Sequence, residues 1–416
     1  MVPATRMEIL VLAPYPPYPA RSGGASRTLH LARALARHHR VSLLCFGGAV
    51  ERAGLEPIRE WCDAVHTVDY PAAVRRRRLY QLRSLVGRRS YSHHAYFSAA
   101  MAGALARLLS RGRVDLVQAD ASEMGYYWPL PGDALRILNT QNVEHLILDR
   151  TWRGEASRIR RLFARLEARK LMRDELAACR GSDAVLAVSA VDAAALRPHA
   201  GPVPVRVVPN GVDTEFFTPG GEPEHPGRIL FTGAIGYRPN TDATCHFAER
   251  ILPRIRAAAP DATFAVVGKD PPEQVRRLAG EGVVVTGTVP DVRPWMRTAA
   301  VFVVPLRVGG GTRLKILEAM ASGRPVVSTS VGCEGLDVTP EEDILVGDTP
   351  EAFAAQVLRC LRDPGLRARL GARGRALVER RYRWEAIGDR LAAFYEELWR
   401  SRSAAPRARG ARPALA

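Results

Sequence analysis

Short apolar runs alternate with amphipathic segments along the first half of the chain. The first run, Met7–Ala13, reads MEILVLA; a Pro- and Gly-containing loop follows it, and a helical pattern then occupies Ala25–Ala36. The runs VSLLCF, VDLVQA, LRILNT and AVLAVS repeat the strand pattern with helical stretches between them. Such alternation predicts a parallel sheet that is covered by helices on both faces.

A second series of the same kind follows a change of composition. From Val205 to Gly227 the chain is rich in Pro, Gly and Asn, which is typical of a linker. The runs RILFTG, TFAVVG, VVVTG, VFVVP and PVVST then alternate with helices again. We therefore predict an α/β protein with two doubly wound, Rossmann-like domains that face each other across a cleft, formed by residues 1–205 and 206–383.

The end of the chain carries one more amphipathic pattern, YRWEAIGDRLAAFYEELWRS. No further core-forming segment follows it, so we expect a helix over residues 384–401 that returns to the N-terminal domain. The remaining basic stretch, residues 402–416, is predicted to be disordered.

The most informative segment is Gly309–Glu318, which reads GGGTRLKILE and follows the buried-strand pattern AAVFVVP. A helix that begins at Thr312 would carry Arg313 and Lys315 in its first turn, where the helix dipole is already positive. A bound anion would resolve this conflict, because free N–H groups and two cations together bind phosphate well. The alternative is a solvated helix with a Gly-rich entry loop. The predicted diphosphate site consists of Gly310, Gly311, Thr312, Arg313 and Lys315.

The acidic residue of this segment, Glu318, is expected on the same packed helix stripe as Leu314 and Ala321. A carboxylate on a packed face needs hydrogen-bonding partners. Ribose hydroxyls would serve, and a neighbouring Arg is the structural alternative.

Glycines follow the first strand of each predicted domain. Gly23 and Gly24 precede the first helix, and Gly233 lies in the segment FTGAIGYRPNTDA of the second domain. The first loop is not a GxGxxG motif, and no acidic residue follows it at the distance that a dinucleotide ribose requires. A hydride-transferring enzyme is therefore disfavoured.

The charge and aromatic content of the chain limit the kinds of partner that it is expected to bind. The 416 residues carry 60 Lys and Arg against 43 Asp and Glu, a formal charge of +17, which favours anionic partners. Arg75–Arg89 and the helix predicted over residues 156–180 are especially basic, and either a solvated face or membrane-surface attraction explains them. Aromatic residues are only 7% and scattered, so a nucleic-acid-binding role is not expected.

The cysteine spacing and the apolar runs bear on the cellular compartment and on metal binding. The six cysteines have no CxxC spacing, which favours a reducing compartment and argues against structural zinc. No run of eighteen apolar residues and no signal-peptide core are present in the sequence. We expect a cytoplasmic protein that binds no metal, with contact to the inner face of a membrane.

The ordered set of motifs resembles the family 4 glycosyltransferases, which have the GT-B fold. The motifs are AVSAVDAAALRP with VRVVPNGVDTEFF, then FTGAIGYRPNTDA, VVGKDPPEQVRRL, VVVTGTVPDVRPWMRTAAVFVVPLR and GGGTRLKILEAMASGRPVVST, and they extend to about Ser401. The resemblance implies transfer of a sugar from a nucleotide-sugar donor with retention of configuration, usually without a metal or other cofactor. It implies a donor on the C-terminal domain and an acceptor on the N-terminal one.

Carried over residue by residue, the resemblance gives Glu318 the role of the second acid in the E-x7-E motif, which binds the donor ribose. The first acid would stand at position 310, where this chain has Gly310. Only Arg238 stands near the place of the family's first phosphate-binding cations, so Arg313 and Lys315 would take over that role.

Other positions match less specifically. The glycine loop matches at Gly23 and Gly24, and base contacts are expected near Lys269 and Val289. After LRILNT, where many relatives have a histidine, this chain has Glu144 and His145 in NTQNVEH; an active-site role and simple helix capping both explain them.

The function predicted is therefore a hexosyltransferase that acts on a glycan or lipid-linked acceptor, as in polysaccharide biosynthesis. Alternatives on the same fold are a sugar-nucleotide epimerase, a phosphorylase, or a non-catalytic relative that binds a nucleotide or a partner. The nucleotide base, the sugar and the acceptor are not specified by these motifs.

Overall fold

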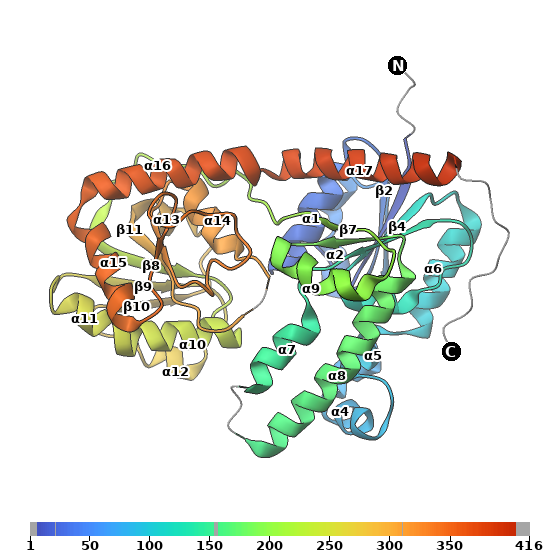
Figure 1. The fold of residues 1–416 in the computed structure, drawn as a ribbon, viewed down its shortest axis with the longest axis horizontal. Helices are drawn as coiled ribbons and strands as arrows, with labels where there is room; N and C mark the ends of the chain where they lie inside the picture. Colours follow the sequence, from blue (N-terminus) through green and yellow to red (C-terminus); the bar gives the residue numbers. More distant parts are fainter. Residues whose placement is uncertain (1–5, 21, 154–156, 310, 405–416) are drawn as a thin grey trace. The chain divides into compact units, whose positions relative to one another are not determined.

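The computed structural model describes residues 6–20, 22–153, 157–309 and 311–404. The chain divides into two compact units (Figure 1): unit 1 combines Met1–Pro209 with Glu385–Ala416, and unit 2 is Asn210–Trp384. Each unit has one parallel sheet of its own, so the prediction of two doubly wound α/β sheets is confirmed.

The sheet of unit 1 has the strand order β3-β2-β1-β4-β5-β6-β7, and all its pairings are parallel. The central strands are continuous apolar runs that are buried on both faces, as expected for a sheet covered by two helical layers. The strands are β1 (Glu8–Ala13), β2 (Arg40–Phe46), β3 (Ala64–Val68), β4 (Leu116–Asp120), β5 (Leu135–Asn139), β6 (Ala184–Ala187) and β7 (Val205–Val207).

Helices connect these strands and cover the sheet of unit 1 (Figure 1). Five of them begin after a serine whose hydroxyl accepts a backbone N–H of the first turn, the usual N-cap arrangement. They are α1 (Gly23–Ala36), α2 (Ala49–Ala53), α3 (Ala72–Arg75), α4 (Arg77–Val86), α5 (Tyr91–Tyr96), α6 (Ala99–Arg111), α7 (Glu144–Arg153), α8 (Arg158–Gly181) and α9 (Ala190–Ala200), with 3-10 turns at Glu56–Glu60 and Ser122–Tyr127.

The sheet of unit 2 has the order β10-β9-β8-β11-β12-β13 and is also parallel throughout. Its strands are β8 (His225–Thr232), β9 (Thr263–Val267), β10 (Val283–Gly287), β11 (Ala299–Val304), β12 (Val326–Ser328) and β13 (Leu345–Val346). Its helices are α10 (Arg238–His246), α11 (Leu252–Arg256), α12 (Glu273–Arg276), α13 (Arg293–Thr298), α14 (Leu314–Ala321), α15 (Pro350–Arg362) and α16 (Pro364–Arg381), with a π-helical turn at Phe247–Ile251.

The last helix, α17 (Trp384–Ala404), packs on unit 1. It lies very close to α1, because a Cβ on Gly388 would be only 2.1 Å from Cβ of Ala34. Nε2 of His38 lies 2.8 Å from Oδ1 of Asp389 at the same contact. The helix continues to Ala404, beyond the residue 401 expected; of the tail predicted to be disordered, residues 405–416 lie outside the described residues.

A chain of buried polar side chains joins α17 to the centre of the unit 1 sheet. The hydroxyl of Tyr395 donates to Oε1 of Gln118 at 2.6 Å, and Nε2 of Gln118 donates to Oδ1 of Asp120 at 2.7 Å. The same Asp120 oxygen accepts Nδ2 of Asn139 at 2.7 Å, and Oδ1 of Asn139 accepts two N–H groups of Arg27. Burial raises the pKa of Asp120 and lowers that of Arg27 to about 10.

Candidate donor site

Four loops of unit 2 follow the carboxyl ends of neighbouring strands. Gly233 follows β8, Lys269 follows β9, Val289 follows β10, and the segment 305–309 follows β11. Because the strands are parallel and adjacent in the order β10-β9-β8-β11, all four loops lie at one edge of the sheet. Ligands of open α/β sheets bind at this edge, where the chain connections diverge to the two sides.

The first of these loops approaches the second so closely that only glycine fits. Gly233 has φ +142°, and Gly268 has φ +153°. A Cβ on Gly268 would lie 1.7 Å from the carbonyl oxygen of Gly233. A Cβ on Gly233 would lie 3.0 Å from Nζ of Lys315, so the glycine gives that ammonium group its place.

The glycine loop before α14 differs in one respect from the sequence-based prediction. The helix begins at Leu314 instead of Thr312, and Arg313 is its N-cap residue with φ −92° and ψ 95°. No side chain caps this terminus and its first turn has no acidic residue. Gly311 has φ +67°, Oγ1 of Thr312 accepts Nδ2 of Asn210 at 2.7 Å, and Gly310 lies outside the described residues.

The guanidinium of Arg313 folds back over its own loop. Its side chain donates to the carbonyl of Gly311 and, at 3.5 Å, to that of Val331. Only 9% of the residue is exposed. A buried cation therefore stands at the positive end of a helix, as the sequence conflict predicted, although it occupies the cap position and not the first turn.

Lys315 points toward the loop after β8. Its Nζ donates to Oδ1 of Asn240 at 2.9 Å and lies 3.9 Å from the centre of the Phe231 ring. Nδ2 of Asn240 donates to the carbonyl of Ala234 at 2.8 Å, which fixes the amide. Burial lowers the pKa of Lys315 to about 7; Glu318 opposes this shift and Arg313 adds to it.

Glu318 lies one turn further along α14 and is half-buried. Burial raises the pKa of its carboxyl to about 7, and nearby Lys315 opposes the shift. Within the described residues, the carboxylate has no hydrogen-bonding partner and no ion pair. The Arg partner that was the structural alternative is thus not found there, and the carboxylate is left available to a hydroxyl-bearing ligand.

The other predicted residues of this unit have less distinctive surroundings. Lys269 is half-buried and its carbonyl accepts the N–H of Ile235 at 2.9 Å. Val289 is half-buried against the unit 2 core. Arg238 is exposed at the start of α10, whereas Asn240, two residues later, is the residue that contacts Lys315. Sequence reasoning missed Asn240, because nothing local links it to a lysine that far along the chain.

In unit 1 the paired glycines begin α1. A Cβ on Gly24 would lie 2.0 Å from Oε1 of Gln141 and 2.2 Å from the hydroxyl of Tyr15. That hydroxyl donates to Oε1 of Gln141 at 3.0 Å. Gly23, by contrast, is exposed, so the close approach depends on Gly24 alone of the pair.

Glu175 of α8, which the sequence did not indicate, meets the segments that follow β4 and β5. Oε1 of Glu175 accepts Oγ of Ser122 at 2.7 Å and the N–H of Glu144 at 3.1 Å. Its Oε2 lies 2.5 Å from Nδ1 of His145. Burial raises the pKa of the Glu123 carboxyl, and the nearby Glu144 carboxylate raises it further. The sequence signal for Glu123 was the string ADASE, which spans the end of β4 and places this glutamate three residues beyond it.

These contacts decide part of the question left open for Glu144 and His145. Glu175, from α8, caps the start of α7, and His145 is held by the same carboxylate. Capping therefore accounts for the backbone of both residues and the imidazole of His145. The carboxyl of Glu144 accepts Nδ2 of Asn142 at 3.0 Å, and burial raises its pKa.

Each of the two units has its own parallel, doubly wound sheet, which is the architecture of the GT-B class of fold. In the second unit, helix α14 follows a glycine loop and has Arg313 and Lys315 at its start. Residues 21–216 match the family described as Glycosyltransferase Family 4, and residues 226–363 match the one described as Glycosyl transferases group 1. The chain belongs to the family 4 glycosyltransferases of group 1.

Individual relatives agree with this assignment. A GDP-mannose-dependent monoacylated α-(1-6)-phosphatidylinositol monomannoside mannosyltransferase of Corynebacterium glutamicum is 30% identical over 205 residues, 44% of this chain and 54% of the relative. The chain thus spans about half the length of the curated relatives it matches.

Solved structures share the fold over nearly the whole chain. A sucrose-phosphate synthase from Thermosynechococcus elongatus has a TM-score of 0.69 at 20% identity, covering 95% of this chain and 100% of its own. HepE of Anabaena, in complex with UDP-glucose, has a TM-score of 0.67 at 14% identity, covering 94% and 100%.

Proposed function

We propose that this protein transfers a sugar from a nucleotide-sugar donor to a glycan or lipid-linked acceptor, with retention of anomeric configuration and without a metal. The observation that carries the proposal is the start of α14. There a half-buried lysine with a lowered pKa lies against Gly233, and a carboxylate without a described partner follows one turn later. Both groups are costly to the fold unless a ligand uses them.

In this proposal the donor diphosphate binds at the start of α14. Arg313 and Lys315 supply positive charge, and the N–H groups of Gly311 and Thr312 supply further donors. Glu318 accepts the ribose hydroxyls, and the base lies near Lys269 and Val289, beyond the ends of β9 and β10. Gly233 leaves room for the diphosphate beside Lys315.

The chemistry asks little of an acid or base from the protein. The bond from the anomeric carbon to the diphosphate breaks as the acceptor oxygen attacks on the same face, and the cations stabilise the charge that develops on the leaving phosphate. A phosphate oxygen is then placed to take the acceptor proton. Glu123 is a poor candidate for a base, because burial raises the pKa of its carboxyl and favours the protonated form.

GDP-mannose is the first donor to test, since the Corynebacterium relative is named as dependent on it. The name of that relative also favours a lipid-linked acceptor, which unit 1 would bind, with Gly23 and Gly24 at the acceptor side. We propose a location at the inner face of the cytoplasmic membrane. Among the described residues no helix is long and apolar enough to cross a bilayer.

The test is a sugar-transfer assay with a panel of nucleotide sugars and lipid-linked or glycan acceptors, with and without EDTA. We expect nucleotide diphosphate release that depends on the acceptor, continues in EDTA, and gives a product with the donor's anomeric configuration. Lys315→Met should lose this activity, whereas Arg254→Met, at an exposed residue of α11, should keep most of it. An inverted product or metal-dependent turnover would refute the mechanism.

Two other outcomes would replace the proposal. An altered sugar nucleotide formed without any acceptor would indicate an epimerase. Tight nucleotide binding without turnover for any donor would indicate a non-catalytic relative.

A further inference from the structure

Helix α4 has its apolar side turned toward solvent. Leu79, Leu82 and Val86 follow one another at spacings of three and four residues, so they share one face of the helix. Their exposed fractions are 56%, 64% and 91%. The opposite face carries the buried Ser84. A surface helix of a globular protein normally has the reverse pattern, with its leucines in the core.

The first half of α8 repeats this pattern beside α4. Ile159 and Leu162 are 83% and 59% exposed, and Met172 is 41% exposed further along the helix. Together with the outward residues of α4, they form one exposed apolar set on the two helices. We call this set, with its neighbouring arginines, the α4–α8 surface; it comprises Arg76, Arg77, Arg78, Leu79, Leu82, Arg83, Val86, Arg158, Ile159, Leu162 and Met172.

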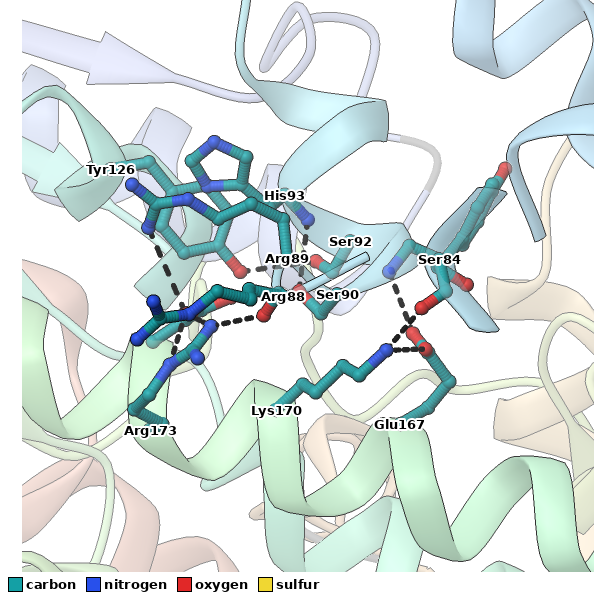
Figure 2. Close-up of polar contacts among 12 residues, drawn as sticks. Ser84, Arg88, Arg89, Ser90, Ser92, His93, Tyr126, Glu167, Lys170 and Arg173 are labelled. Atoms are coloured by element: carbon teal, nitrogen blue, oxygen red, sulfur yellow. Dashed lines mark hydrogen bonds and ion pairs between the residues drawn. The ribbon is translucent and has the colours of Figure 1, made fainter. Parts of the chain in front are cut away.

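The outward leucines do not belong to a loosely held helix. Lys170 and Arg173 of α8 donate to the carbonyls of Ser84 and Arg88, which closes the C-terminal end of α4 onto α8 (Figure 2). Oε2 of Glu167 accepts the N–H of Tyr91 at 2.6 Å. Ser90 donates to the buried Asp174 at 3.0 Å. These contacts hold the C-terminal end of α4 and the segment after it against α8, and thereby fix which side of α4 faces outward.

The charge of this surface has one sign. The sequence contains no Asp or Glu from Pro71 to Ser92, nor from Ser157 to Leu166. Two acids of α8, Glu167 and Asp174, are buried and accept from Tyr91 and Ser90 at the start of α5. Exposed leucines among arginines suit a partner that offers both negative charge and an apolar interior.

We propose that the α4–α8 surface docks on an anionic lipid bilayer. Leu79, Leu82, Val86 and Ile159 enter the boundary between headgroups and acyl chains, while the arginines contact the headgroup phosphates. A nucleic acid would satisfy the arginines and leave the leucines exposed, and an apolar protein partner would leave the arginines unmatched. The inference deepens the proposed function. It rests on that function in one respect: a lipid-linked acceptor is the reason that the protein would need a bilayer.

The experiment is co-sedimentation of the full chain with vesicles of phosphatidylcholine alone or of phosphatidylcholine and phosphatidylglycerol in equal parts. We expect binding to the anionic vesicles only, weakened by salt. Leu82→Glu with Val86→Glu should reduce the partition coefficient at least about tenfold, because charged residues enter the apolar boundary unfavourably. Val50→Glu is the matched control, since Val50 of α2 is 88% exposed elsewhere on unit 1 and should bind as the parent does.

Charge is tested separately. Arg83→Gln should weaken binding about fivefold, the factor expected for one basic residue near an anionic surface. Arg107→Gln, an exposed residue of α6, should leave it unchanged. Equal binding to neutral vesicles, no binding to either, or a Leu82→Glu, Val86→Glu variant that binds normally would each overturn the proposal. So would a concentration-dependent dimer that this variant abolishes, because the occupant would then be a second copy.

The two proposals fail differently. Nucleotide affinity, measured by calorimetry without vesicles, should be unchanged in the Leu82→Glu, Val86→Glu variant. Vesicle binding without nucleotide binding would refute the transferase proposal and leave the docking surface intact. Nucleotide binding and transfer to a soluble acceptor without vesicle binding would refute the docking surface and leave the transferase proposal intact.

Discussion

Donor binding should take up a proton at Lys315. Burial holds the pKa of this lysine at about 7, so near pH 9 almost all of the free protein has a neutral amine there. A bound diphosphate favours the ammonium form and raises that pKa. Binding above about pH 7 must therefore include protonation of Lys315, and nucleotide affinity should fall as the pH rises.

The size of the effect follows from the pKa. Each pH unit above about 7 costs about 1.4 kcal/mol, so the dissociation constant should rise about tenfold per unit. The contact itself is worth about 1.5–3 kcal/mol, which limits the total loss to roughly 10- to 100-fold. Glu318, whose pKa is also about 7, titrates in the first unit of this range and is largely ionised only above about pH 8, so the tenfold slope is expected from there upward.

The assay is calorimetric titration with a nucleoside diphosphate across this pH range, in buffers of different ionisation enthalpy, which counts the protons taken up. Lys315→Arg should bind with almost no pH dependence, because an arginine stays charged. Lys315→Met should bind weakly at every pH. Lys269→Met should keep the slope of the parent. A Lys315→Arg variant with the parent's slope would show that another group titrates.

Three further predictions concern single contacts. Arg313→Ala should weaken nucleotide diphosphate binding roughly 10- to 100-fold without unfolding the protein; unchanged calorimetric affinity would remove Arg313 from the site. Glu318→Gln should mainly reduce donor affinity, by about 1.5–3 kcal/mol, and a fall in melting temperature alone would argue for a structural role. Tyr395→Phe should lower the free energy of unfolding in urea by about 1–3 kcal/mol, because Oε1 of Gln118 loses its buried donor; Tyr18→Phe, at a half-exposed tyrosine, should not.

The fold was predictable from the sequence where a strand is buried on both faces and therefore consists of a continuous run of apolar residues. AAVFVV and EILVLA became central strands, buried almost throughout. The strands that the sequence did not indicate are short or lie at sheet edges: β3 is half-buried along its whole length, β7 is VRV with two exposed residues, and β13 has only two residues. Their positions depend on pairing with a neighbour and not on a pattern of their own.

The site was predictable only in part, for a different reason. The conflict between two cations and a helix N-terminus is local, so the sequence indicated Arg313 and Lys315 as candidates for the site. Two residues hold the ammonium of Lys315: Asn240 from α10 and Phe231 from β8. They lie beside it only because β8 and β11 are neighbours in the sheet. The start of α14 was misplaced by two residues, because the sequence gives no sign that Arg313 leaves the helical conformation.

The return of α17 to unit 1 has a consequence for synthesis on the ribosome. The first 209 residues emerge before the helix that supplies Tyr395 to Gln118 and packs Gly388 against Ala34. At typical translation rates unit 2 takes roughly 10–40 s to follow. During that interval the nascent first sheet has an uncovered α1 and an unsatisfied glutamine, while unit 2 is contiguous and can fold as soon as it emerges. The second unit should therefore complete its fold first, and the earliest part of the chain should be the last to become stable.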